Sequence, residues 1–189
     1  YGQIICMTTA HIGNTGVNQE DPESRRVWCA GFIVHDLTDT PSNWRATGTL
    51  DQYLKDRGVP GLAGVDTRAL TRHLRSRGVQ RALILRKGEE SKAAEFFRML
   101  PGFEGRDLIR EVTASSPYLW PEKGVGPGPE FPPAGEASKK RVVAVDFGLK
   151  WNLLRALERR GCEVQVVPAM ATTQEILSYK PDGVFLSNG

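Results

Sequence analysis

Cysteine is scarce in this sequence, and its spacing excludes the commonest uses of the residue. The three cysteines, Cys6, Cys29 and Cys162, are an odd number and lie far apart. Because they form no Cys-x-x-Cys pair, they indicate neither a zinc site, nor a redox pair, nor a disulfide framework. We predict three reduced thiols in a cytoplasmic protein, since a free cysteine commonly behaves as a small buried apolar residue.

Long apolar runs and a strong charge of one sign are also missing. No run approaches the ~20 apolar residues that a membrane-spanning helix requires. The 25 Lys and Arg residues nearly balance the 22 Asp and Glu residues, which gives a net charge of +3 spread over the whole length. We therefore expect no membrane and no nucleic acid, and a small molecule or a protein as partner.

A local cluster of positive charge lies on one segment that is expected to be helical. It consists of Arg68, Arg72, Arg75 and Arg77. Such a cluster is compatible with nucleic acid, but the modest net charge favours a solvated face or an ion-paired contact with a partner protein.

Turn-forming residues gather in one part of the chain. Between residues 116 and 140 the sequence holds six prolines and four glycines, a composition that supports neither a helix nor a central strand. We therefore predict a domain at 1–117, a Pro/Gly-rich linker at 118–139 and a second domain at 140–189. Tyr1 stands inside a pattern without a leader, and residues 183–189 run from a strand into a loop, so we expect fragment boundaries at both ends.

The amino-terminal part mixes strand and helix patterns. Short apolar runs at 3–8 and 28–34 are typical of strands, and the Gly/Asn-rich residues 11–18 between them predict a loop. Thr49, followed three residues later by Gln52, has the pattern of a capping box that opens a helix, and Gly58 closes that helix.

Two more helices and a strand complete this part. Asp66 is expected to cap a helix that buries Ala69, Leu70 and Leu74 and ends at Gly78. Residues 81–85 then predict a strand, and residues 91–100 predict a third helix. The apolar residues of that helix are expected to share one face: Ala93, Phe96, Phe97 and Leu100. The pattern indicates a compact α+β unit.

After the linker, strand and helix patterns alternate strictly. Strands are predicted at 141–147, 163–167 and 184–186, and helices at 149–160 and after the capping box that Thr172 and Glu175 form. The first of these helices repeats apolar Leu149, Leu153, Ala156 and Leu157. Alternation of this kind predicts a parallel α/β sheet, and three strands are only the opening of such a domain.

The chemistry of an open parallel sheet is expected beyond the carboxyl ends of its strands. Asp146-Phe147-Gly148 and Ser187-Asn188-Gly189 occupy that position. A glycine there allows a sharp turn and brings backbone N–H groups close to a ligand. Spacing alone favours a simple turn at each glycine and leaves ligand binding as the alternative.

Several segments carry a resemblance to a known family. Residues 146–155 (Asp-Phe-Gly-Leu-Lys-Trp-Asn-Leu-Leu-Arg), with Gly161-Cys162 and residues 181–189, resemble the first three strands of a class I glutamine amidotransferase domain. His11-Ile12-Gly13-Asn14-x-Gly16-x-Asn18, Pro41-Ser42-Asn43-Trp44-Arg45 and residues 66–72 resemble the domain that precedes it in the small subunit of carbamoyl phosphate synthetase. The resemblance extends over nearly the whole chain, apart from the linker.

The resemblance implies an α/β protein in which a mixed amino-terminal domain of the swivelling β/β/α type precedes a flavodoxin-like glutaminase domain. The family's activity is glutamine hydrolysis by a cysteine that a His-Glu pair activates, with ammonia passing to a large synthetase subunit that uses ATP and Mg. The resemblance places these three catalytic residues after Gly189, so we expect no cofactor in this subunit and no activity from the segment alone. Gly189 is the one position that matches a glutamine-binding residue of the family.

The remaining cysteines and histidines are poor candidates for this chemistry. Cys162 is expected just after a helix carboxyl end, where the helix dipole opposes a thiolate, and Cys6 and Cys29 lie in predicted strands. His11 stands in a glycine-rich loop without an evident carboxylate or thiol partner, so we interpret it as structural or as part of an interface.

Two other interpretations stay open at the level of sequence. The chain is also compatible with a fused, ammonia-dependent synthetase in which this region is a structural or regulatory module without a nucleophile. It is compatible, less readily, with an interaction protein that keeps the small-subunit fold for binding alone. The residue at the nucleophile position distinguishes the first alternative, and co-purification with a large synthetase distinguishes the second.

Overall fold

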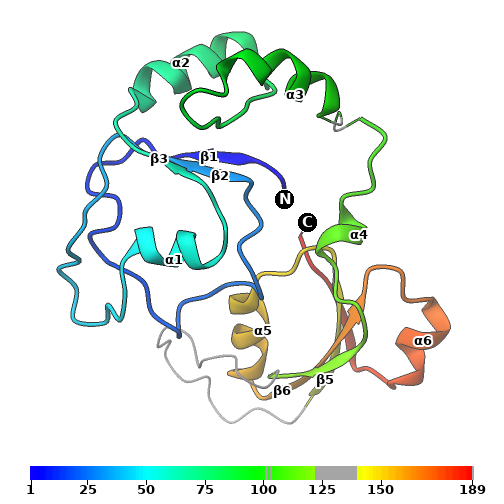
Figure 1. Ribbon diagram of the computed structural model, residues 1–189. Coiled ribbons are helices and arrows are strands. Elements are labelled where there is room, and N and C mark those ends of the chain that lie inside the picture. The colour runs from blue at the N-terminus through cyan, green and yellow to red at the C-terminus, as the bar shows by residue number, and fades with distance from the viewer. Residues whose placement is uncertain (101, 103, 122–139, 189) are drawn as a thin grey trace. The chain divides into compact units, whose positions relative to one another are not determined.

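A computed structural model describes residues 1–100, 102, 104–121 and 140–188 (Figure 1). The chain forms two compact units. Unit 1 contains Tyr1–Asn18 and Arg26–Arg106, and unit 2 contains Gln19–Arg25 and Asp107–Gly189. The short segment Gln19–Arg25 therefore folds with the second unit although its neighbours in sequence fold with the first.

Unit 1 is built on a small parallel sheet. Strands β1 (Ile4–Cys6), β2 (Gly31–Ile33) and β3 (Gly61–Leu62) lie in the order β1-β2-β3. The first two confirm the strand predictions at 3–8 and 28–34. Three helical segments of this unit follow β2, and a 3-10 turn precedes the last of them. Their bounds are α1 (Leu50–Asp56), α2 (Thr67–Arg77), η1 (Glu90–Lys92) and α3 (Ala93–Met99).

The helix ends of unit 1 follow the predicted capping residues. The Thr49 hydroxyl accepts a hydrogen bond from the Gln52 backbone N–H at 3.2 Å, and an Asp66 carboxylate oxygen accepts one from Ala69 N at 2.8 Å. Gly78 closes α2 at φ 78°, a conformation that glycine adopts without strain. The predicted apolar face of α3 is also confirmed, because its four members are half-buried while the remaining residues from 93 to 100 are exposed.

Two predictions for unit 1 are wrong. Residues 81–85 form no strand, because their backbone joins no ladder, although the apolar Leu83, Ile84 and Leu85 are half-buried. Ala69 is exposed, and the inward face of α2 includes Thr67, which is 3% exposed. The Thr71 hydroxyl donates to the Thr67 backbone carbonyl at 2.7 Å, so the Thr71 side chain is satisfied within the helix.

Unit 2 is built on a four-stranded sheet. Its strands are β4 (Tyr118–Trp120), β5 (Lys140–Asp146), β6 (Cys162–Pro168) and β7 (Gly183–Leu186), in the order β4-β6-β5-β7. Its helices are α4 (Ile109–Val112), α5 (Trp151–Glu158) and α6 (Thr173–Ser178). The predicted parallel pairing is confirmed, since β5 pairs in parallel with both β6 and β7.

Strand β4 was not anticipated. Tyr118–Trp120 pairs antiparallel with β6 at the edge of the sheet, within the stretch interpreted as a linker. An edge strand tolerates the following Pro121, because one side of the strand needs no ladder partner. The other residues of the proposed linker, 122–139, lie outside the described residues.

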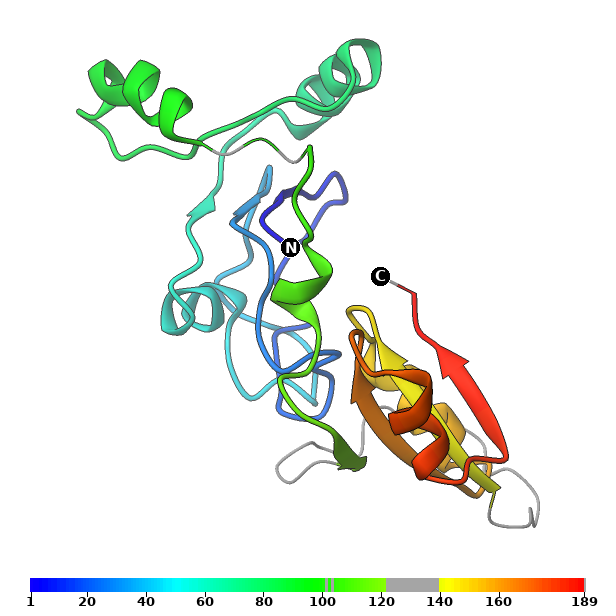
Figure 2. The same cartoon turned by 90° about the vertical axis from the view of Figure 1, so that its right-hand side faces the viewer.

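The two helices that follow β5 and β6 cover opposite faces of the sheet (Figure 2). Ala144, Val164 and Val166 face α5, in a core cluster with Trp120 and Leu154. The alternate positions Val143, Val145 and Val167 face α6 and pack with Ile176 and Tyr179. Burial on both faces explains why these strands read as continuous apolar runs in the sequence.

Helix α5 differs in detail from the expected one. It begins at Trp151, and Leu149 belongs to the preceding turn, where it is buried at 7% exposure. The fully covered positions of the helix are Leu154 and, unexpectedly, Arg155 at 2% exposure. Among the helices of the described residues, none is long and apolar enough to cross a membrane.

Helix α6 is capped by a titratable residue, Glu175. Both the backbone N–H and the hydroxyl of Thr172 donate to the Glu175 carboxylate, at 2.6 and 2.9 Å, and they hold the pKa of Glu175 below its ordinary value of 4.5. A carboxyl whose pKa is lowered by folding stabilises the protein above its unfolded pKa and loses that effect as the pH falls through the folded value.

We therefore expect Glu175→Gln to lower the thermal midpoint at pH 7, and the difference from the unmodified protein to shrink below about pH 4.5. Thermal unfolding of both proteins between pH 7 and pH 3 measures this. Glu95→Gln, on the exposed surface of α3, is the control that should show no such pH-dependent difference. A difference for Glu175→Gln that stays constant over the whole range would contradict the prediction.

Candidate functional site

The carboxyl ends of the three parallel strands meet at one edge of the sheet in unit 2. In the ladder Asp146 is opposite Pro168, and Val145 is opposite Leu186. The two segments singled out in the sequence consequently lie side by side, because the backbone N–H of Phe147 donates to the Ser187 hydroxyl at 2.9 Å. The site is predicted just beyond these strand ends, and the structure describes that region as far as Asn188.

Asp146 is the organising carboxylate of this edge. It is 7% exposed, and its Oδ1 accepts hydrogen bonds from Gly148 N at 2.9 Å and Leu149 N at 2.7 Å. Its Oδ2 accepts from Ala114 N at 2.8 Å. A carboxylate that accepts three backbone N–H groups has little capacity left for a substrate, so Asp146 holds the frame of the site.

Gly148 has the conformation that the turn interpretation requires. Its φ is 114°, in the region that residues with a Cβ rarely adopt, and its N–H is directed to Asp146. Gly189, the predicted glutamine-binding residue, lies outside the described residues. Ser187, two positions before it, is 8% exposed, and its hydroxyl donates to the Asn188 carbonyl at 3.0 Å.

Thr113 joins the ends of two strands and was missed in the sequence analysis. Its hydroxyl donates to the Asp146 carbonyl at 2.6 Å and accepts from Ala169 N at 2.8 Å, so it connects β5 with the residue that follows β6. Arg25 in turn donates to the Thr113 carbonyl at 2.7 Å. No local pattern marks Thr113 or Ala114, because their partners lie more than thirty residues away.

None of the three cysteines belongs to the segments that form this edge. Cys162 opens β6 at the opposite end of that strand and packs against the core cluster under α5. In unit 1, Cys6 is part of β1 and Cys29 is half-buried. That none of the three is a catalytic nucleophile stays a prediction.

The three histidines are all exposed. His11 is exposed at φ 59°, and His35 forms an exposed pair with its neighbour Asp36 at 2.6 Å. An exposed contact between sequence neighbours is weak evidence for a functional role. The four arginines of α2 are all exposed, as a solvated or protein-binding face requires.

Comparison with known proteins gives two family matches in one chain. Residues 1–84 match the model of the carbamoyl-phosphate synthase small chain, CPSase domain, and residues 143–189 match the model of glutamine amidotransferase class-I. Similar proteins include the carbamoyl phosphate synthase small chains of Symbiobacterium thermophilum and Pseudomonas aeruginosa. The first is 48% identical over 100% of this chain and 49% of its own length, and the second is 47% identical over 99% and 50%.

A third relative, the carbamoyl phosphate synthase small chain of Syntrophotalea carbinolica, is 45% identical over 100% of this chain and 50% of its own. The fold and the matches define the class: an α/β protein that joins a CPSase domain to a class I glutamine amidotransferase domain. The chain belongs to the family of carbamoyl phosphate synthase small chains. It spans about half the length of the curated relatives it matches.

Proposed function

We propose that the protein containing this chain hydrolyses glutamine to glutamate and ammonia and supplies the ammonia to a large, ATP-dependent synthetase subunit. The product of the pair would be carbamoyl phosphate, for arginine and pyrimidine biosynthesis. The observation that carries this proposal is the order of the two family matches, CPSase domain first and amidotransferase domain second, in a single chain. Amidotransferases of other pathways share the second domain and lack the first.

In the proposed reaction a cysteine thiolate outside this segment attacks the glutamine amide, ammonia leaves, and water releases glutamate from the thioester. The residues described above would supply the surface on which the substrate rests. Asp146 and Ser187 fix the strand ends, and Gly189, which follows them, would bring its backbone close to glutamine or the acyl intermediate. ATP and Mg would bind to the large subunit, and we assign no residue of this chain to them.

The finer architecture is part of the same proposal. Unit 1 would belong to a swivelling β/β/α domain, and residues 140–189 to the opening of a flavodoxin-like glutaminase domain, with evolutionary domains at 1–117 and 140–189 and a linker between. The intact protein would act in the cytoplasm as a heterodimer with the large subunit. The relatives' printed name, small chain, supports a separate subunit over a fused, ammonia-dependent enzyme.

The experiment is co-expression of the full-length protein with the large synthetase subunit from the same source. We expect the pair to co-purify and to produce glutamate and carbamoyl phosphate from glutamine, ATP and bicarbonate. Replacement of the cysteine at the nucleophile elbow should abolish glutamine-dependent synthesis and leave synthesis from free ammonia unchanged. A complex that uses only ammonia, with no cysteine at that position, would overturn the proposal in favour of the fused, non-catalytic alternative.

A further inference from the structure

A short segment of the amino-terminal sequence is built into the amidotransferase unit. Gln19–Arg25, here called the strap, lies within the residues that match the CPSase domain, yet it folds with unit 2. Its hydrogen bonds reach α5, which lies within the residues that match the amidotransferase model. Contacts that hold α5 are therefore supplied by residues outside the amidotransferase match.

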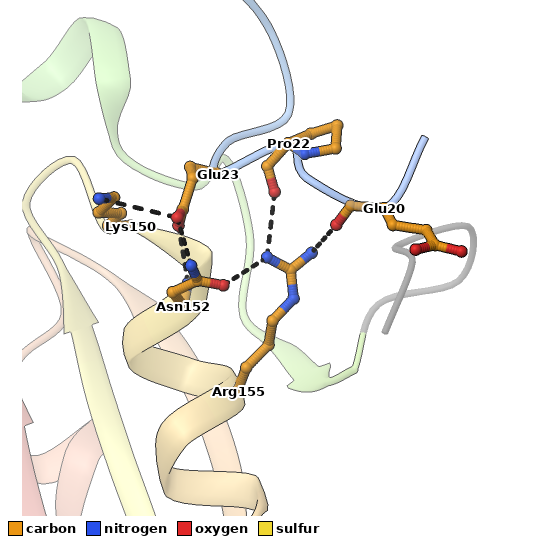
Figure 3. A network of polar contacts seen from close by, with 6 residues as sticks. All are labelled: Glu20, Pro22, Glu23, Lys150, Asn152 and Arg155. Carbon is orange, nitrogen blue, oxygen red and sulfur yellow. Dashed lines mark hydrogen bonds and ion pairs between the residues drawn. The ribbon is translucent and has the colours of Figure 1, made fainter. Parts of the chain in front are cut away.

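Glu23 of the strap caps the amino-terminal end of α5 (Figure 3). The Glu23 carbonyl accepts from Trp151 N at 2.9 Å, and its carboxylate accepts from Asn152 N at 3.0 Å and from the Asn152 side-chain amide. The helix needs this help, because Lys150 at its own N-cap position forms no side-chain cap bond. The negative charge of Glu23 is also favourable at the positive end of the helix dipole.

Arg155 fixes the backbone of the strap from the other side. This buried guanidinium donates to the Pro22 carbonyl at 3.1 Å, to the Glu20 carbonyl at 3.4 Å and to the Asn152 side-chain oxygen at 2.8 Å (Figure 3). Burial lowers the pKa of Arg155, and the nearby charge of Glu23 opposes that shift. The strap is consequently held at both Glu20 and Glu23, and its carboxylate has a defined position.

The same carboxylate lies next to a residue of the site turn. Lys150 Nζ is 3.7 Å from Glu23 Oε1, and Lys150 directly follows the turn in which Asp146 accepts from Gly148 and Leu149. The ion pair is partly exposed, with side-chain exposures of 60% for Lys150 and 32% for Glu23, so by itself it contributes little stability. Its importance is geometric, because loss of the cap would free both the start of α5 and the turn joined to it.

We propose that Glu23 is a positioning residue for glutamine hydrolysis, which sets the carboxyl-edge turn and Lys150 by capping α5 from the amino-terminal sequence. This inference rests on the proposed function, since it concerns the same edge of the sheet. It assigns to the CPSase-domain sequence a direct part in shaping the amidotransferase site. The glutaminase half then depends on the amino-terminal sequence for catalysis.

The test uses the full-length protein in complex with its large subunit. We expect Glu23→Ala to lower kcat/KM for glutamine about 10- to 100-fold, the scale of a small misplacement of reacting groups. Synthesis from free ammonia should stay unchanged. Glu23→Gln keeps one amide oxygen for the Asn152 N–H, so it should recover most of the loss. Faster hydrogen exchange at the Trp151 and Asn152 amides, with no change in α6, is the accompanying structural result.

Two control variants separate positioning from stability. Val166→Ala opens a cavity in the core at a residue with 0% exposure, and it should lower the thermal midpoint at least as much as Glu23→Ala without changing kcat/KM. Glu163→Gln removes a partly exposed ion pair with Arg141 near the start of β6, at the end of the strand away from the site. It should change neither the thermal midpoint nor kcat/KM appreciably.

The outcomes divide clearly. If Glu23→Ala keeps the full kcat/KM for glutamine per folded molecule, or loses only as much as Val166→Ala does, Glu23 has a structural role and the inference is wrong. If the unmodified complex does not hydrolyse glutamine at all, the proposed function fails, and the exchange rates at Trp151 and Asn152 still report whether Glu23 caps α5.

Discussion

Replacing Asp146 with alanine is expected to lower the free energy of unfolding by about 3 to 4 kcal/mol. The carboxylate is 7% exposed and accepts from the backbone N–H groups of Ala114, Gly148 and Leu149. Alanine would leave these donors without an acceptor in a region that water reaches poorly, and each such donor costs about 1 kcal/mol or more. Urea denaturation of the full-length protein, followed by tryptophan fluorescence, measures the loss.

Two further variants make this measurement specific. Asp146→Asn keeps Oδ1 for Gly148 and Leu149 but places an amide nitrogen against the Ala114 N–H, so its loss should be intermediate. Asp182→Ala is the matched control: its carboxylate also accepts a backbone N–H, from Arg141 at 2.8 Å, but it is exposed to solvent. We expect a much smaller loss there, and equal losses at Asp146 and Asp182 would contradict the assigned role.

Much of the fold followed from local patterns in the sequence. The capping residues Thr49, Asp66 and Thr172 predicted the starts of three helices, since a cap forms bonds only within its own first turn. The parallel pairing of β5, β6 and β7 followed from alternation with helices and from continuous apolar runs. In both cases the pattern lies in the elements themselves and in the order in which they follow one another.

The failures share a different physical origin. Residues 81–85 have a strand pattern, but a strand exists only where a neighbour offers a ladder, and local sequence does not encode the neighbour. Strand β4 was missed for the converse reason, because β6 supplies its partner and overrides the proline-rich surroundings. Tertiary pairing decided both cases.

The candidate site divides in the same way. Its location was predictable, because strand ends in a parallel sheet converge, and Asp146 and Ser187 stand directly at those ends. The supporting residues Thr113, Glu23 and Arg155 were not predictable from local sequence, because they bond to residues between 33 and 135 positions away. Arg155 is, in addition, a charged side chain that is buried, which is rare for arginine.

Gly189→Val in the full-length protein is expected to abolish most glutamine-dependent synthesis. Gly189 lies outside the described residues, and the prediction rests on its place after Ser187 and Asn188 and on the glutamine-binding role proposed for it above. If the backbone approaches the substrate or the acyl intermediate, a branched side chain intrudes. The expected loss is about 2 to 4 kcal/mol of transition-state stabilisation, the scale for one oxyanion donor. Synthesis from free ammonia should continue, because that reaction would occur on the large subunit.

The competing explanation is that Gly189 serves only its turn, as expected for Gly161 at φ 77° between α5 and β6. A turn role predicts a lower thermal midpoint with nearly normal catalysis per folded molecule, whereas substrate contact predicts the opposite. Glutaminase activity, ammonia-dependent activity and thermal midpoint are therefore measured on one preparation, with Gly161→Val, in the turn between α5 and β6, as the matched variant. Equal losses of both activities would leave Gly189 as a structural residue. The same conclusion would follow if Gly189→Val were unfolded while Gly189→Ala kept full glutaminase activity. A selective loss of glutaminase activity in Gly189→Val, at an unchanged midpoint, places the backbone of this position against the reacting amide.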